Sequence, residues 1–496
     1  MASKGFLAVD IGASSGRHLI GRFDGERLTL QEVHRFANGG VEMAGTVYWD
    51  LPGLWASVRE GMAAAAQAAP GEIASVGVDT WGVDFGLLDR DDRLLGNPVT
   101  YRDDRTVGVM ERALQVVPRE EIFRHTGLQF MQINTLFQLA AMKFADSPQL
   151  DIAESLLMVP DLFHWLLTGR KCNEMTEAST SQLYNPVSGD WAFELIEQFG
   201  LPSRVFQDIA QPGTELGALR PEVAQQTGLG STKVVLPGSH DTASAVMAVP
   251  AESEANAAPD WCYISLGTWA LMGIESPRPV ITDDVLQHAF TNEGGVGGTT
   301  RLLKNITGLW LVQQCREAWN RAGRSWDWED LNRLSASATP RSSLVNPDAP
   351  DFMAPDDMPA AIREYCRKTG QTVPEDEGAV LRAALDSIAL KFRQVLASCE
   401  QLAGRRIETI HIVGGGTLNK QLCQAAADAC GRRVVAGPVE ATAIGNVMVQ
   451  AVADGLIADI RQARDVVRRS FPVDEYQPRD TPAWDEASTR FQQLPA

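Results

Sequence analysis

Apolar and polar positions near the start of the chain form short runs separated by glycine-containing turns. An apolar run at 5–9 leads to Asp10, small residues fill 11–16, and a second run follows at 17–23. Two such runs joined by a glycine turn predict a β-hairpin. The predicted elements of this region are strands at 5–10, 17–23 and 27–36, a helix at 51–69 and a strand at 73–79. Antiparallel strands followed by alternating helix and strand indicate an α/β or mixed-sheet fold.

The same pattern restarts past residue 245, where a strand, a glycine turn and a second strand are predicted between Trp261 and Glu275. Ser265-Leu-Gly-Thr268 matches Asp10-Ile-Gly-Ala13, which is too short a match to prove a repeat but is the trace that a duplicated hairpin fold would leave. Further predicted elements are helices at 309–322, 378–402 and 419–430 and a strand at 409–413, which ends in three glycines. A strand, a glycine loop and a helix present backbone N–H groups to an anion or a nucleotide.

We expect two large domains. The stretch 250–259 is small, acidic and bounded by prolines, which is typical of a connection between domains. The predicted division is 1–248 for an N-terminal domain, 249–460 for a C-terminal domain and 461–496 for an extension. Because the last 25 residues contain four prolines, we predict that they only lie across the surface.

Charge and composition narrow the class of protein. The 496 residues carry a net charge of -19, which argues against a nucleic-acid surface and against an anionic membrane surface as partner. No stretch approaches the roughly 20 apolar residues that a membrane span requires. The seven cysteines are scattered without paired metal-ligand spacing, so we interpret them as reduced thiols in a cytoplasmic enzyme.

Two segments combine residues that suit phosphoryl transfer. The turn from Asp10 to Arg17 offers glycines, hydroxyls, backbone donors and a cation beside one carboxylate, which suits a nucleotide phosphate with its Mg²⁺ held by Asp10, directly or through water. A plain hairpin turn remains the alternative. Asp241 follows the apolar strand at 233–236 and begins a small-residue helix, so it is either a base that accepts a hydroxyl proton or an N-cap.

Two further segments can be interpreted either as ligand-binding or as purely structural. Trp81 either packs on the apolar face of a sugar or belongs to the core, and Gly82 brings the backbone close to ligand hydroxyls. The alternating charges of 101–105 are either a solvated loop or a clamp for hydroxyls. The chain has no G-x-S-x-G elbow, no H-E-x-x-H and no Walker A sequence, which disfavours a hydrolase or a P-loop enzyme.

Taken in order, eight motifs resemble the FGGY carbohydrate kinases over nearly the whole chain. They are Val9-Asp-Ile-Gly-Ala-Ser-Ser-Gly-Arg17, Asp79-Thr-Trp-Gly-Val-Asp-Phe85, Tyr101-Arg-Asp103, Gly238-Ser-His-Asp-Thr242, Ser265-Leu-Gly-Thr-Trp269, Asn305-Ile-Thr-Gly-Leu-Trp310, His411-Ile-Val-Gly-Gly-Gly416 and Gly437-Pro-Val-Glu-Ala-Thr442. Each is weak alone, but their order is specific.

The resemblance implies two ribonuclease-H-like domains of the actin and hexokinase ATPase type, with a ligand cleft between them. It implies ATP and Mg²⁺ as cofactors, L-rhamnulose as substrate and its 1-phosphate as product. The implied site residues are Ala13, Ser14, Ser15, Gly16 and Arg17 for the phosphates, Thr268, Gln313 and Gly415 for ATP, Gly82, His240, Thr242 and Asn305 for the sugar, and Asp241 as the base. Another ketose, L-fuculose or L-xylulose, is the alternative substrate.

Proteins of another class share the implied fold. Sugar-sensing regulators would need a DNA-binding helix-turn-helix, whereas this sequence starts at its first predicted strand. Chaperone-like ATPases would need an added peptide-binding domain, for which the length leaves no room. Sugar-dependent turnover of ATP separates a kinase from these ATPases.

Overall fold

The computed structural model describes residues 4–252, 260–353 and 355–495. Two compact units are found in it: the first combines 1–252, 275–302 and 441–471, and the second combines 253–274, 303–440 and 472–496. Most of the predicted connection at 250–259 lies outside the described residues. In the part of the chain that is described, no helix is both long and apolar enough to cross a bilayer.

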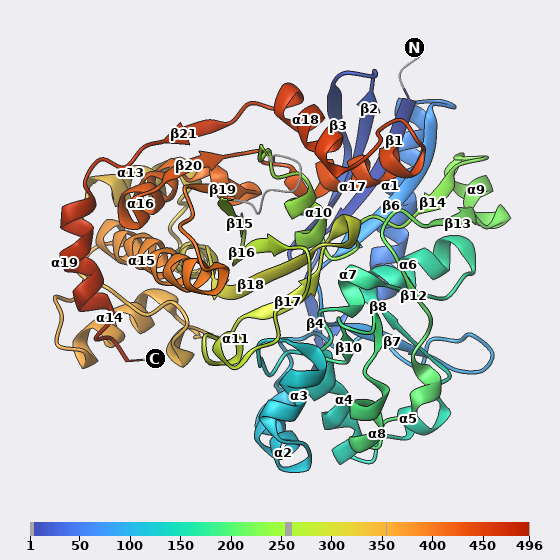
Figure 1. Cartoon of the computed structure of the whole chain (residues 1–496), viewed down its shortest axis with the longest axis horizontal. Coiled ribbons are helices and arrows are strands. Elements are labelled where there is room, and N and C mark those ends of the chain that lie inside the picture. Colours follow the sequence, from blue (N-terminus) through green and yellow to red (C-terminus); the bar gives the residue numbers. More distant parts are fainter. Residues whose placement is uncertain (1–3, 253–259, 354, 496) are drawn as a thin grey trace. The chain divides into compact units, whose positions relative to one another are not determined.

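The first unit is built on a sheet of strand order β13-β14-β6-β1-β2-β3 (Figure 1). Its strands are β1 (Lys4–Ile11), β2 (Ser15–Phe23), β3 (Leu28–Ala37), β6 (Ile73–Thr80), β13 (Glu215–Ala218) and β14 (Lys233–Val235). β1 is antiparallel to β2 with Asp10 opposite Arg17, and parallel to β6 with Asp10 opposite Asp79. The predicted hairpin is therefore confirmed, and the register brings three charged residues together at one end of the sheet.

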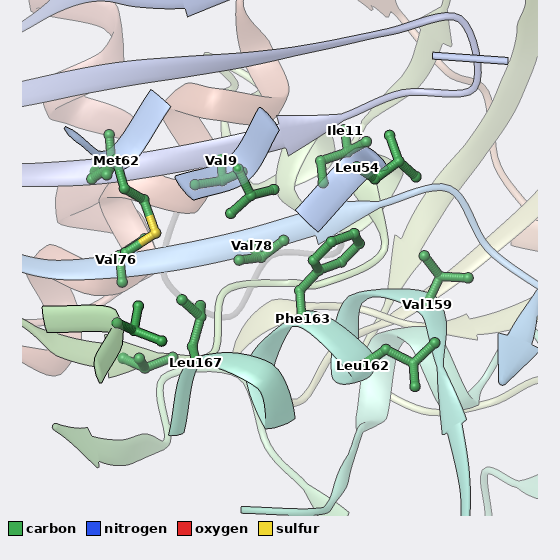
Figure 2. Packing of buried hydrophobic residues seen from close by; sticks show 14 of the residues in the cluster. Val9, Ile11, Leu54, Met62, Val76, Val78, Val159, Leu162, Phe163 and Leu167 are labelled. Atoms are coloured by element: carbon green, nitrogen blue, oxygen red, sulfur yellow. The ribbon is translucent and has the colours of Figure 1, made fainter. Parts of the chain in front are cut away.

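The core of this unit forms where helices pack on β1 and β6. Figure 2 shows Val9 and Val78 from the two strands packed with residues of α1 (Leu51–Ala68) and α6 (Val159–Thr168). Met62 and Phe163 are fully buried there. Folding removes the apolar side chains of this cluster from water, and this burial is the main driving force for folding. Since alternate strand residues face opposite sides, Asp10 lies between the core residues Val9 and Ile11 and points away from this cluster.

A second part of the unit is inserted between β6 and β14. Its helices are α2 (Val109–Val116), α3 (Arg119–Thr126), α4 (Thr135–Phe144), α5 (Pro148–Ile152), α7 (Met175–Ala178) and α8 (Phe193–Gln198), whereas α9 (Pro221–Thr227) packs on α1 in the core of the main sheet. Strand pairs β7 (Phe85–Leu88) with β8 (Ser155–Met158), and β9 (Asn173–Glu174) with β12 (Ile209–Ala210), join them. Phe137 and Leu156 are fully buried in its separate apolar cluster.

Helix α17 (Ala441–Ala453) comes from late in the chain but packs on β1, β6 and α10 (Asp241–Met247) of the first unit. The Gln450 amide donates to the carbonyl of Leu7 at 3.0 Å. At Gly445 an added Cβ would stand 1.8 Å from the carbonyl oxygen of Ser244, so only glycine permits this close approach of α17 to α10.

The second unit repeats the strand arrangement of the first. Its strands are paired in the order β18-β16-β15-β19-β20-β21, where β15 (Trp261–Leu266) is antiparallel to β16 (Trp269–Ser276) and parallel to β19 (Thr409–Val413). The other strands are β18 (Thr300–Thr307), of which 303–307 belong to this unit, β20 (Arg433–Ala436) and β21 (Asp474–Tyr476). Its main helices are α12 (Trp310–Arg321), α13 (Trp328–Ser337), α14 (Met358–Lys368), α15 (Glu377–Ala403), α16 (Lys420–Cys430) and α19 (Thr481–Phe491). The equivalent strand orders confirm the duplicated hairpin fold.

The C-terminal residues correct the sequence prediction. β21 pairs with β20, and α19 buries Trp484 and Phe491 with exposed fractions of 1% and 4%. The prediction that the last 25 residues only lie across the surface was therefore wrong, because it gave weight to the prolines. Trp484, Ala487 and Phe491 follow helical spacing and form one apolar face.

Candidate active site

Three ionisable side chains meet where β1 and β6 end and β2 begins. The Nε and Nη2 atoms of Arg17 each lie 3.0 Å from Oδ2 of Asp10, whose exposed fraction is 5%. Asp79 is fully buried, and burial followed by the charge of Asp10 raises its pKa well above the usual range. Sequence reasoning assigned Asp10 and Arg17 to the site but gave Asp79 no role.

The predicted phosphate loop is a short turn between β1 and β2. The backbone N–H of Gly12 donates to the carbonyl of Ser15 at 2.9 Å, and the side-chain amide of Asn38 donates to the carbonyl of Gly12 at 2.8 Å. Ala13 and Ser14 form the tip of the turn, and Ser14 is exposed. These bonds hold the backbone of the tip in one conformation.

The glycine at position 16 serves packing. An added Cβ there would stand 2.1 Å from the ring of Phe36, on the neighbouring strand β3. Gly16 and Ser15 are the first residues of β2, so these two predicted phosphate ligands belong to the strand rather than to the tip.

Asp241 is the first residue of α10, and His240 occupies the N-cap position without a capping side-chain bond. The interpretation of Asp241 as the N-cap was therefore wrong. Its Oδ1 accepts a hydrogen bond from Thr242 Oγ1 at 3.0 Å and lies 3.5 Å from His240 Nε2. Desolvation by the surrounding protein is the main cause that raises its pKa, although 32% of the side chain is exposed. His240 opposes this shift, and the charge of Asp10 adds to it.

Helix α7 holds the segment before Asp241. Glu174 accepts a hydrogen bond from the backbone N–H of Ser239 at 3.0 Å, and Thr176 Oγ1 accepts one from the N–H of His240 at 3.2 Å. Burial raises the pKa of Glu174 to about 7. These bonds fix the backbone that carries His240 and Asp241. The sequence could not predict them, because α7 lies about 65 residues earlier in the chain.

Glu177, also on α7, is a second carboxylate that sequence reasoning missed. It is fully buried, and among the described residues neither of its oxygens has a hydrogen-bond partner. Burial, followed by the charges of Asp161 and Glu174, raises its pKa well above the usual range. A buried carboxylate of this kind is held more easily in its neutral form.

The loop after β6 brings Gly82 against Thr180, where an added Cβ would stand 3.1 Å from the threonine side chain. The next residue, Val83, has a φ of 70°, which a β-branched residue adopts only at a cost of roughly 1–3 kcal/mol. Thr180 Oγ1 accepts from the N–H of Val83 at 3.0 Å, and Thr135 Oγ1 donates to its carbonyl at 2.6 Å. Thr180 and Thr135, which lie outside this loop, therefore hold its strained backbone in place.

Trp81 belongs to the core. Its exposed fraction is 5%, its ring lies 4.1 Å from that of Trp49, and its indole N–H donates to Asp84 at 3.0 Å. The interpretation of Trp81 as a platform for a sugar was therefore wrong. Burial raises the pKa of Asp84 to about 6, despite hydrogen bonds that oppose the shift.

The segment 101–105 is only partly solvated, because Arg102 and Asp104 are exposed while Tyr101 and Asp103 are buried. Tyr101 and Asp103 are each 7% exposed, and the Asp103 carboxylate accepts from the N–H groups of Val47 and Arg105 at 2.8 and 2.9 Å. The Asp103 carboxylate therefore ties this segment to β5 (Thr46–Trp49), and the interpretation as a clamp for hydroxyls stays a prediction.

The second unit brings together two of the residues assigned to ATP. Thr268 lies in the turn between β15 and β16, and its Oγ1 donates to Gln313 Oε1 on α12 at 3.0 Å. The N–H of Trp310, at the start of α12, donates to the Thr268 carbonyl at 3.1 Å. Asn305, assigned to the sugar, is half-buried on β18.

The three glycines after β19 differ in their surroundings. Gly414 has a φ of 89°, and a Cβ added to Gly416 would stand 2.2 Å from Leu266. A Cβ added to Gly415 would meet nothing within 4 Å. Gly414 and Gly416 therefore serve the turn and its packing, whereas Gly415 faces open space, as a residue that contacts a ligand would.

Comparisons with known proteins show the family to which the chain is similar. Residues 6–248 match the model of the FGGY family of carbohydrate kinases, N-terminal domain, and 262–453 match that of its C-terminal domain. The chain is 44% identical over 486 residues to a rhamnulokinase of Bacteroides thetaiotaomicron, covering 98% of each chain. It is 42% identical to a rhamnulokinase of Pectobacterium atrosepticum, covering 100% of this chain and 97% of that one.

Solved structures show the same fold. The chain superposes on a ligand-bound xylulose kinase of Lactobacillus acidophilus with a TM-score of 0.80 at 17% identity, covering 99% of this chain and 96% of that one. A glycerol kinase of Plasmodium falciparum with ADP gives 0.75 at 15% identity, covering 99% and 97%. The family models and the relatives confirm the resemblance expected from the ordered motifs, and the chain belongs to the FGGY family of carbohydrate kinases.

Proposed function

We propose that the chain phosphorylates L-rhamnulose at its 1-hydroxyl, with ATP as phosphoryl donor, to give L-rhamnulose 1-phosphate and ADP in the breakdown of L-rhamnose. The rhamnulokinases that match nearly the full length support the choice of sugar. The observation that carries the chemistry is the Asp241 carboxylate, which lies at the start of α10 with a raised pKa and a partly exposed side chain.

Asp241 accepts the proton in the proposed reaction. The 1-hydroxyl oxygen forms a bond to the γ-phosphorus of ATP while the bond to the bridging oxygen breaks, so ADP leaves and the hydroxyl proton passes to the Asp241 carboxylate. The transition state of such transfers is loose, so a base that orients the attacking oxygen and takes its proton is sufficient. A raised pKa makes Asp241 a better proton acceptor than an ordinary aspartate, provided that it is ionised when the sugar binds.

The other site residues have proposed binding roles. Ala13 to Arg17 bind the phosphates, and Thr268, Gln313 and Gly415 bind ATP, in keeping with the open space at Gly415. Gly82, His240, Thr242 and Asn305 bind the sugar. These assignments follow the family motifs. The domain division at 248 and 460 stays a prediction from the sequence.

Mg²⁺ fits the carboxylate chemistry of the first unit. Mg²⁺ keeps several waters and binds one or two carboxylates together with substrate phosphates, so a ready-made cage of protein ligands is not needed. Among the described residues no group of three or more His, Cys, Asp or Glu side chains forms such a cage. Asp10 would hold the ion, which would neutralise charge on the phosphates.

The test is the Asp241→Asn substitution, which removes the proton acceptor and keeps the shape. We expect kcat to fall by about 1,000-fold, while ATP binding measured by isothermal titration calorimetry stays within twofold. Asp91→Asn, at an exposed turn, is the matched control and should keep full turnover. Near-full turnover of Asp241→Asn would reject the role of the base.

The sugar is tested with a panel of ketoses in a coupled assay. L-rhamnulose should have the highest kcat/KM, ahead of L-fuculose and L-xylulose, because a misplaced hydroxyl leaves buried groups of the site unpaired. A higher kcat/KM for either alternative would replace the proposed substrate and leave the kinase chemistry in place.

A further inference from the structure

Behind the imidazole of His240 lies an ion pair that none of the motifs includes. Glu293 is on β17 (Thr291–Gly294) and Arg301 is on the part of β18 that belongs to the first unit. Arg301 is fully buried and Glu293 is 5% exposed, and their Nη2 and Oε2 atoms are 3.2 Å apart. Both reach the same ring nitrogen: Arg301 Nη2 lies 3.1 Å from His240 Nδ1, and Glu293 Oε2 lies 3.3 Å from it.

These contacts decide which ring nitrogen carries the proton of a neutral imidazole. A guanidinium has only donors, so a hydrogen bond from Arg301 requires the lone pair of Nδ1. The single proton then lies on Nε2, on the side of Asp241 Oδ1 at 3.5 Å. If Nδ1–H instead donated a hydrogen bond to Glu293, Nε2 would present its lone pair to that side.

The geometry favours Arg301 over Glu293 as the partner of Nδ1. The Arg301 contact has hydrogen-bond geometry, whereas Glu293 Oε2 has no hydrogen-bond partner of acceptable geometry among the described residues. Arg301 is also fixed in place, because its Nε donates to the carbonyl of Gly294 at 2.8 Å. Glu293 supplies the negative charge that a fully buried guanidinium needs.

We propose that Arg301 is a positioning residue that holds neutral His240 in the tautomer protonated on Nε2, with Glu293 as its counter-ion. His240 then acts toward the active site only as a hydrogen-bond donor, to the Asp241 carboxylate or to a ketose oxygen. Asp241 is left as the one acceptor of the hydroxyl proton at this point of the site. The catalytic consequence rests on the proposed function, but the tautomer does not.

The first test reads the tautomer directly in the ligand-free protein. ¹⁵N-histidine-labelled protein is examined by nuclear magnetic resonance, above the pH at which the imidazole protonates, and the signals of His240 are identified by their loss in His240→Gln. We expect Nδ1 to give the signal of an unprotonated ring nitrogen and Nε2 that of a protonated one. The opposite assignment in the wild-type protein overturns the proposal, whatever happens to any variant or to the kinase assay.

The second test removes the pair without leaving a buried charge. In the double variant Arg301→Met with Glu293→Met, both charges are lost together, a replacement that buried pairs often tolerate. We expect a mixture of both His240 tautomers, a KM for the ketose raised by about tenfold, and a KM for ATP within twofold. An unchanged tautomer together with an unchanged ketose KM contradicts the proposal.

The control is a second buried Arg–Glu pair of the same unit, in which Arg464 Nη1 lies 2.9 Å from Glu275 Oε2. The double variant Arg464→Met with Glu275→Met should leave the His240 tautomer and the ketose KM unchanged. A failure of the proposed function can be told apart from a failure of this proposal. Full turnover of Asp241→Asn would reject Asp241 as the base, whereas the spectrum of His240 would still report its tautomer.

Discussion

The side-chain amide of Asn446 donates a hydrogen bond of 2.6 Å to the carboxylate of Asp79. The other carboxylate oxygen has no partner among the described residues. Helix α17 thus supplies a bond to a buried acid that stands opposite Asp10 in the sheet. The same amide also donates to the carbonyl of Gly77 at 3.1 Å.

Replacing Asn446 with leucine should destabilise the protein, because it leaves a buried carboxylate and a carbonyl without their donor. We expect the free energy of unfolding, measured in urea, to fall by about 2 kcal/mol or more. The control is a double-mutant cycle with Asp79→Leu, in which the double variant should lose less stability than the two single variants added together. Strict additivity would show that the Asn446 contact does not stabilise Asp79.

Stability should decrease as the pH rises, owing to two buried acids, Glu177 of α7 and Glu174, which caps the start of α7. A carboxylate whose folded-state pKa is raised favours folding below its unfolded pKa, and this contribution is lost as the pH rises through the folded pKa. For Glu174, whose ordinary value is 4.5, the loss runs from about pH 4.5 to about pH 7. Glu177 contributes a loss of the same sign, because burial raises its pKa well above the usual range.

The substitution Glu177→Gln should reduce this pH dependence. Glutamine cannot ionise, so we expect the melting temperature of this 496-residue chain at pH 8 to rise by roughly 1 °C for each kcal/mol gained, with little change at pH 5. Differential scanning calorimetry across this range measures it. The exposed Glu60→Gln is the control and should follow the wild-type curve. Equal effects of both substitutions at pH 8 would contradict the role of burial.

Arg17 should matter for ATP through its contact with Asp10. In Arg17→Gln the carboxylate loses its cation, which increases the negative charge that the phosphates meet. We expect the KM for ATP to rise by about tenfold, with the KM for the ketose unchanged. Arg22→Gln, on the same strand but paired with Glu72 at 3.2 Å, is the matched control. An unchanged KM for ATP in Arg17→Gln would rule out this role.

Replacing Gln313 should weaken the binding of ATP and leave the binding of the ketose unchanged. Its side chain accepts the hydrogen bond of Thr268, so Gln313→Leu frees the hydroxyl and removes an amide from the turn between β15 and β16. We expect a KM for ATP raised by about five- to tenfold, measured with saturating ketose. Gln314→Leu, one residue along the same helix, bonds to Glu317 and should change nothing. A rise in the ketose KM instead would contradict the assignment of Gln313 to ATP.

The two hairpins could be predicted from the sequence because their signals are local. Apolar runs and glycine turns lie within about 20 residues of each other, and β1, β2, β15 and β16 appear where these patterns place them. The helices α12, α15 and α16 likewise follow their apolar spacing, with ends that differ by at most one residue. The C-terminal helix was missed because the prolines in and around it masked a short apolar face.

The site could be predicted only in part, because most of its supports are distant in sequence. Asp10 and Asp241 occur in motifs, whereas Glu177 and Arg301 have no local pattern that marks them. Their roles arise when separate elements of the first unit meet. Trp81 has a local pattern, but that pattern is ambiguous. An aromatic residue beside a glycine suits a sugar site and a buried core equally well, and only its neighbours in the fold decide between them.

The packing of α17 on the first unit has a consequence for biosynthesis. The strands β1 and β6 leave the ribosome early, but the helix that covers them is complete only at Ala453. Synthesis at roughly 5–20 residues per second therefore leaves these strands without their last helix for tens of seconds. A nascent chain that ends at residue 252 lacks Asn446 and Gln450, and we expect it to depend on chaperones until the remaining chain emerges.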